Sequence, residues 1–421
     1  MLSFSRFSSR LAQNSINFGL VLLIVDETGK AFLSSLLVLA LVVPATVAGI
    51  VAGVAADRLP KRLLVVSGHL ARAAICAFVA WKGGGVAAYY ATAVGLSLAG
   101  QFAGAAEGAM LPGVVQRHEL ARANAIGHAV TIAGQLLGFG ALTPLALRVF
   151  DTPRILFAIC AALFVLAAFY AAAIGRVTAP SRLEIGGRVD APWWKVGWSQ
   201  MRSDSAVMHA AVELTLIATT VIILASLLPT YITEVLGLPI EVGAAVLIPG
   251  AAGMALGLRV AGALAHRVPH GALSSIGFAA FVFLLAALAF VNPESEFLAG
   301  YGPFAWLTGV SIGDFDGGGV VAATVVFPLG FAYAIVAVAG QTVLNDRVPL
   351  QLQGRVLATQ GALAALAASA PVLVAGALSD AVGVTPVLAL VAAATAIVAV
   401  ANIRRPNTGA PGPPIIGTRW R

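Results

Sequence analysis

Long apolar runs alternate with short polar breaks along nearly the whole chain. A transmembrane helix needs about 20 mainly apolar residues to cross a hydrocarbon core of about 30 Å. Twelve runs approach or exceed that length, and they cover residues 7–26, 32–55, 63–81, 87–110, 121–147, 155–175, 206–233, 240–265, 272–291, 319–344, 353–379 and 384–402. The pattern therefore predicts an all-α polytopic membrane protein with twelve transmembrane helices, arranged as two six-helix halves.

A polar stretch separates the two sets of six runs. It carries many charges together with Pro180, Pro192 and the pair Gly186-Gly187, which favour irregular backbone. We interpret residues 1–175 as an N-terminal half, 176–205 as a linker and 206–402 as a C-terminal half. Residues 403–421 are rich in Pro and Gly and predict a disordered tail.

A short internal repeat supports the division into halves. The segment Gly53-Val-Ala-Ala-Asp-Arg-Leu-Pro-Lys-Arg62 aligns with Gly262-Ala-Leu-Ala-His-Arg-Val-Pro-His-Gly271, with Gly, Ala, Arg and Pro in the same places. Each copy lies at the end of the second apolar run of its half. The second copy has His266 where the first has Asp57. Two halves of related architecture are typical of secondary transporters.

Composition and charge agree with a membrane protein and predict its orientation. The chain is 59% hydrophobic and 10% charged, whereas soluble proteins are about 25% charged. If the runs are twelve spans, twenty of the 25 Lys and Arg residues lie on the side that holds both termini. Positive residues stay cytoplasmic, so we expect both termini, the linker and the tail in the bacterial cytoplasm, with the spans in the inner membrane. This asymmetry accounts for the net charge of +7, and we expect no nucleic-acid partner.

Few residues suggest covalent chemistry. Cys76 and Cys160 both lie in apolar runs, which predicts neither a disulfide framework nor a metal cluster. No hydrolase elbow or phosphate-binding loop is present in the sequence. We therefore expect no enzyme activity, no cofactor and no metal, and any active transport would have to use an ion gradient.

The turn between the second and third runs carries the most specific motif. Its pattern G-x-x-A-D-R-x-x-x-R, from Gly53 to Arg62, resembles the signature loop between helices 2 and 3 of the major facilitator superfamily. The segments 111–115, 119–125 and Gly354-Arg355-Val356 resemble the branch that holds bacterial siderophore and macrolide exporters. Two exporter motifs are incomplete, since Phe139 replaces a Pro in the fifth run and His69 replaces an Asp three residues before Arg72.

The resemblance implies a gate at this turn. Asp57 would cap the inner end of the eleventh helix, near Gln351, where unpaired backbone amides attract a carboxylate. The remaining gate residues would be Gly53, Arg58, Arg62, Glu107 and Arg355. Glu107 could pair with Arg58 or Arg62, or it could act as a substrate or proton carboxylate. The alternative interpretation is a cluster of charges that only fixes topology.

Glu213 is the candidate for proton coupling. It lies in the seventh run, about 8 residues from the inner end and thus roughly 10–12 Å deep at 1.5 Å per residue. Desolvation at that depth favours the neutral carboxyl. His209 lies four residues earlier on the same helical face. The alternative is an interfacial Glu213 that reaches the headgroups or pairs with Arg202 or Lys195.

Polar residues in the spans predict a substrate cavity between the halves. On the fifth run, polar side chains at spacings of three and four share one helical face. The alternative is hydrogen bonding between helices, which contributes about 0.6 kcal/mol per contact. The cavity candidates are Asn14, Asn17, Gln101, His128, Thr131, Gln135 and Gln341.

We expect a monomeric secondary transporter that exports a hydrophobic or amphipathic small molecule in exchange for protons. Its predicted cavity has few polar groups, whereas a sugar needs many hydrogen-bond partners. One alternative is an importer or uniporter of a small metabolite on the same fold. Another is a membrane scaffold or lipid-processing protein that transports nothing.

Overall fold

The computed structural model describes residues 1–114, 126–127, 130–131, 133–135, 137–150, 152–174, 193–238, 246–264, 268, 270–291 and 317–403. Every regular element in these ranges is helical. The all-α class predicted from the apolar pattern is confirmed. Seven helices in the described residues are long and apolar enough to cross a membrane, and three shorter apolar helices, Ala31–Thr46, Ala133–Leu147 and Val384–Val398, accompany them.

The N-terminal half begins with four long helices, α1 (Leu2–Thr28), α2 (Ala31–Arg58), α3 (Lys61–Lys82) and α4 (Val86–Val114). A π-helical turn, η2 (Gly138–Leu142), then leads into α6 (Thr143–Phe150), and α7 (Pro153–Ala172) completes the half. The connections are short because the sequence provides sharp stops. Gly29 follows α1 with a φ of 62° and Gly83 follows α3 with a φ of 87°, a region that favours glycine.

The C-terminal half starts with a short helix, α8 (Trp193–Ser203), within the stretch predicted as a linker. It continues through α9 (Ser205–Thr230), the π-helical η3 (Tyr231–Val235), α11 (Leu247–Leu264) and α12 (His270–Ala289). The last helices are α14 (Gly317–Arg347), α15 (Leu350–Val382) and α16 (Val384–Ile403). Residues 176–192 of the predicted linker and 404–421 of the predicted tail lie outside the described residues.

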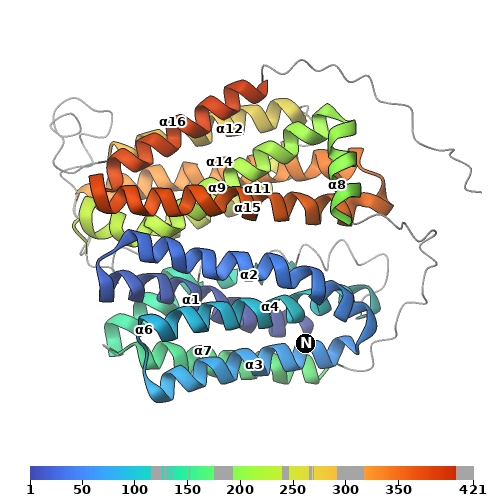
Figure 1. Ribbon diagram of the computed structural model, residues 1–421, viewed down its shortest axis with the longest axis vertical. Helices are drawn as coiled ribbons and strands as arrows, with labels where there is room; N and C mark the ends of the chain where they lie inside the picture. The colour runs from blue at the N-terminus through green and yellow to red at the C-terminus, as the bar shows by residue number, and fades with distance from the viewer. Residues whose placement is uncertain are drawn as a thin grey trace, which may run out of the picture.

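Two helical bundles lie side by side, and α2 and α15 face each other where they meet (Figure 1). We call the side where α1 begins and α16 ends the terminal side, and the opposite side the distal side. Each bundle has its own apolar core, around Phe157 and Phe164 in the first and Phe281 and Leu285 in the second. Leu39 of α2 is buried in the core of the second bundle, so the two cores meet at this border.

A smaller apolar cluster also bridges the two bundles. Phe18 and Leu22 of α1 are buried in it, and partly buried side chains from both halves pack against them, namely Phe139, Leu147, Leu228 and Leu247. Phe18 and Phe139 are in ring contact at 5.3 Å between centroids. Because these side chains come from the distal parts of their helices, the cluster helps to close the molecule on that side.

Candidate functional site

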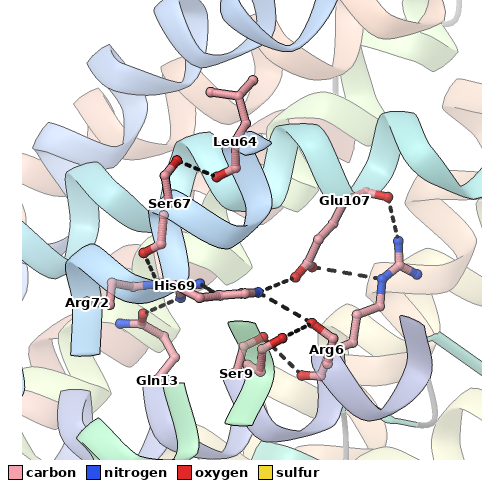
Figure 2. A network of polar contacts seen from close by, with 11 residues as sticks. Arg6, Ser9, Gln13, Leu64, Ser67, His69, Arg72 and Glu107 are labelled. Carbon is pink, nitrogen blue, oxygen red and sulfur yellow. Dashed lines mark hydrogen bonds and ion pairs between the residues drawn. The ribbon is translucent and has the colours of Figure 1, made fainter. Parts of the chain in front are cut away.

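A buried network of charged side chains joins α1, α3 and α4 (Figure 2). Arg6 comes from α1, His69 and Arg72 from α3, and Glu107 from α4. The His69 side chain has no exposed surface, and the Glu107 side chain is 5% exposed. Ionisable groups buried within a membrane domain are costly, so they are retained where they do something specific.

Glu107 is at the centre of this network. Its Oε1 lies 3.1 Å from His69 Nε2, and its Oε2 lies 3.9 Å from Arg6 Nε. Arg6 also donates through Nη2 to the backbone carbonyl of Glu107, at 3.0 Å. One carboxylate thus holds together three helices, because each of its neighbours comes from a different helix than its own.

Arg72 determines the tautomer of His69. Its Nη2 contacts His69 Nδ1, and a guanidinium can only donate hydrogen bonds. Nδ1 must therefore accept, and the ring proton is on Nε2, from which it is donated to Glu107. His69 is neutral in this arrangement. The two guanidinium groups of Arg6 and Arg72 then outnumber the single carboxylate.

The network continues along α1. Arg72 Nη1 donates to Gln13 Oε1 at 3.1 Å, and Gln13 Nε2 donates to Asn17 Oδ1 at 2.7 Å. Arg6, Gln13 and Asn17 share a face of α1 because their spacings, seven and four, are whole helical turns. Of the predicted cavity residues, Asn17 is the one that this network includes.

The predicted gate residues lie apart from this network, except for Glu107. The structure pairs Glu107 with His69 and Arg6 rather than with Arg58 or Arg62. Arg62 donates from Nη2 to the carbonyl oxygen of Ala172, and Arg58 is exposed. The side chain of Asp57 lies outside the described residues.

The structure also describes two further predicted gate residues, Arg355 and Gly53. Arg355 Nη1 is buried without a hydrogen-bond partner, one of four such side-chain atoms in the described part of the chain. A Cβ placed on Gly53 would meet nothing within 4 Å.

Glu213 contacts a buried neighbour within its own half. Its Oε2 accepts a hydrogen bond from Ser274 Oγ of α12, and Ser274 is buried. His209 Nδ1 bonds the carbonyl oxygen of Ser205, one turn earlier in α9. The carboxylate of Glu213 therefore points along the α9–α12 contact, and its coupling role stays a prediction.

The other predicted cavity residues bond locally or are only partly buried. Asn14 donates to the carbonyl of Arg10, and Thr131 donates to that of Gly127, each within its own helix. Gln101, Gln135 and Gln341 are partly buried. His128 lies outside the described residues.

Sequence reasoning identified neither Arg6 and His69 as partners of Glu107 nor Gln13 as a partner of Arg72. Helical spacing was a usable signal on α1, and His69 and Arg72 were visible as ionisable residues in an apolar run. The missing information was which faces of α1, α3 and α4 meet. Among the described residues, no group of three or more His, Cys, Asp or Glu side chains could hold a metal ion.

Solved structures of other membrane transporters have a similar fold. A solved structure of a mutant of the nucleoside transporter NupG is similar, with a TM-score of 0.74, 14% identity and coverage of 96% of this chain and 98% of that one. A bacterial homologue of the human lysosomal transporter Spinster, inward-facing and unoccupied, has a TM-score of 0.70, 13% identity and 98% coverage of both chains. No curated protein matches the sequence.

The family match covers most of the chain and includes all members of the buried network. Residues 2–326 match the Major Facilitator Superfamily. The helical architecture, the structural neighbours and this match agree, and the chain belongs to the major facilitator superfamily of membrane transporters.

Proposed function

We propose that the protein is a proton-coupled exporter of hydrophobic or amphipathic small molecules, working by alternating access. The observation that carries the coupling is the buried contact of Glu107 with His69 and Arg6. A transporter that exploits a proton gradient needs a group that can hold a proton within the membrane domain. Glu107 is the acid that lies beside the partly buried Arg6 and beside a neutral His69, which the buried Arg72 contacts in turn.

The charges around Glu107 explain how a proton could drive a movement. While ionised, the carboxylate accepts from His69 and attracts Arg6, which holds α4 against α1 and α3. Protonation removes the negative charge and leaves Arg6 and Arg72 without an opposing charge. The contact between α1 and α4 then weakens, so loading and unloading one proton favours two different arrangements of these helices.

Export of an apolar substrate is favoured by sequence motifs. The segments 111–115, 119–125 and 354–356 resemble exporters of siderophores and macrolides, and few polar side chains are available to bind a sugar. NupG carries nucleosides according to its description, so import of a metabolite on the same fold is the competing function. A susceptibility panel on cells with and without the protein distinguishes them, because export lowers drug sensitivity and import of a nutrient does not.

The proposed orientation places both termini in the cytoplasm of a bacterium, so the terminal side faces inward. Its support is the excess of Lys and Arg on that side. A reporter fused after residue 403 should read as cytoplasmic, and an external signal would reverse the orientation. In the proposed inner gate, Asp57 caps the start of α15 and approaches Arg355, whose unpaired Nη1 is available for such a partner.

The coupling role of Glu107 is tested by Glu107→Gln in proteoliposomes, using a drug found in the susceptibility panel. Gln keeps the shape and the hydrogen bond from His69 but removes the titratable proton. Transport driven by a pH gradient should fall at least about tenfold, a barrier change of about 1.4 kcal/mol, while drug exchange without a gradient continues. Asp26→Asn, at the exposed distal end of α1, is the matched control and should transport normally.

Glu213→Gln separates the two candidate acids. If Glu107→Gln concentrates the drug at the wild-type rate and Glu213→Gln does not, the coupling site lies on α9 and our assignment is wrong. We expect the opposite result, because the contact of Glu213 is with the neutral hydroxyl of Ser274, whereas protonation of Glu107 would leave the charge of Arg6 unopposed.

A further inference from the structure

The distal ends of α2 and α15 are joined by a carboxylate that belongs to the opposite half. Asp380, near the end of α15, accepts hydrogen bonds from the first two backbone amides of α2. The amide of Ala31 lies 2.7 Å from Oδ1, and the amide of Phe32 lies 3.1 Å from Oδ2. These amides have no partner within their own helix, and the helix dipole favours a negative charge at this position. Asp380 is thus an N-cap supplied from the other half.

A layer of buried serines lies one turn below this cap. Ser34 Oγ donates to the carbonyl oxygen of Ser226 in α9 at 2.8 Å, and Ser35 Oγ lies 3.2 Å from Ser226 Oγ. All three serines have no exposed surface. These contacts also join the two halves, and opening the distal side would break them together with the cap.

A glycine shows that the α2–α15 contact is tight at its distal end. At the distal end, a Cβ on Gly376 would overlap Ser35 Oγ and lie 2.9 Å from Phe32 Cα. Toward the terminal side, a Cβ on Gly53 of α2 or on Gly361 of α15 would meet nothing within 4 Å. The two helices are in contact distally and diverge toward the terminal side (Figure 1), which is the arrangement of a transporter closed to the outside under the proposed orientation.

The sequence places the same motif at the ends of both helices. α2 ends with Gly53-Val-Ala-Ala-Asp57 and α15 with Gly376-Ala-Leu-Ser-Asp380, so each has a Gly four residues before an Asp. In α15 the Gly allows the close approach and the Asp caps the start of α2. Since the helices are antiparallel, Asp57 lies at the end where α15 begins.

We propose that Asp380 is the outer latch of the transporter, the counterpart of Asp57 on the inner side. Its carboxylate holds the distal ends together while the terminal side is open, and it must release Ala31 and Phe32 before the distal side can open. The proposal rests on the proposed alternating access, but on neither the substrate nor the proton coupling.

Distances between spin labels in the purified, substrate-free protein test this latch. One pair, Trp81→Cys with Phe290→Cys, reports on the distal side, and a second pair, Leu63→Cys with Ile276→Cys, reports on the terminal side. All four residues are more than half exposed. Each pair has one residue in the N-terminal half and one in the C-terminal half, and none of the four lies on α2 or α15. The buried Cys76 and Cys160 are replaced by Ala so that only the introduced cysteines are labelled.

Asp380→Asn offers one acceptor where two amides need partners, and it removes the charge. The ratio of distally open to distally closed molecules should rise about tenfold, the effect expected for losing a favourable charge at a helix N-terminus. Asp380→Glu keeps the carboxylate and should stay closer to wild type. Gly376→Ala leaves the carboxylate intact but separates the helices sterically, so it should open the same side.

Asp204→Asn is the matched control. Asp204 caps α9 through the amide of Ala206 at 2.8 Å, but both belong to one half. Asp204→Asn should leave the distal and the terminal-side distances between the spin labels unchanged. Wild-type distal distances in a folded Asp380→Asn would overturn the proposal. If Asp380→Asn does not fold, wild-type distal distances in Gly376→Ala would overturn it equally. Failure of drug transport alone bears on the proposed function and not on the latch.

Discussion

Arg72 is the residue on which the buried network most depends. Its guanidinium donates to Gly68, contacts His69 and bonds Gln13, and it lies 4.6 Å from the centre of the Phe164 ring. These partners approach the planar group from several directions at once. A Lys ammonium carries one compact charge on a flexible stem and cannot reproduce this geometry.

Arg72→Lys should therefore lower stability even though the charge is kept. Loss of hydrogen bonds to a charged group costs about 1.5–3 kcal/mol, and a lower apparent Tm in a thermal unfolding assay would report it. Arg259→Lys is the matched control, since Arg259 is exposed on α11. Equal Tm values for Arg72→Lys and Arg259→Lys would show that Gln13 and His69 do not need the guanidinium.

At the scale of helices, close contact depends on glycines. α11 and α14 approach so closely that a Cβ on Gly253 would overlap the carbonyl oxygen of Phe327 and lie 2.8 Å from its carbonyl carbon. A Cβ on Gly257 would lie 2.6 Å from the carbonyl oxygen of Phe331. Small residues four apart are the usual means by which membrane helices bring their backbones together.

Gly253→Ala should consequently push α11 away from α14 and lower the apparent Tm, whereas Gly262→Ala on the same helix should not. Gly262 has open space around its Cβ position, and Ala is the better helix former by about 1 kcal/mol. The apparent Tm values of the two variants are compared by heating each protein and measuring the remaining folded fraction by size-exclusion chromatography. A Gly253→Ala protein as stable as Gly262→Ala would mean that the helices separate without cost.

The length of the apolar runs predicted the helices but not the contacts between them. The predicted spans 32–55 and 353–379 lie within α2 and α15, because run length and sharp stops are local properties of the chain. The partners of Glu107 and the role of Asp380 depend on which helix faces meet, which no local pattern encodes. Asp380 looks like an ordinary loop acid in the sequence, because its ligands, the amides of Ala31 and Phe32, lie about 350 residues away. The short α8 was likewise hidden in a polar stretch, where Gly197 packs against Thr359 of α15.

For the whole molecule, the two proposed latches lie at opposite ends of the α2–α15 pair. They should therefore have opposite effects on the equilibrium between the state closed on the terminal side and the state closed on the distal side. The proposed Asp57 latch stabilises the state closed on the terminal side, and the proposed Asp380 latch stabilises the state closed on the distal side. A ligand or a substitution shifts such an equilibrium only by its difference in free energy between the two states. Weakening either latch should shift the populations in opposite directions.

The double variant Asp57→Asn with Asp380→Asn tests this opposition. The two residues lie at opposite ends of the paired helices, so their effects on the free energy between the states should add. Asp57→Asn alone should lengthen the terminal-side distance between labels at 63 and 276, and Asp380→Asn alone should lengthen the distal distance between labels at 81 and 290. In the double variant the two shifts cancel, and both distributions should return toward wild type. Distances in the double variant equal to those of Asp380→Asn alone would show that Asp57 holds no latch in this chain, and that α15 reaches its terminal-side contacts by another route.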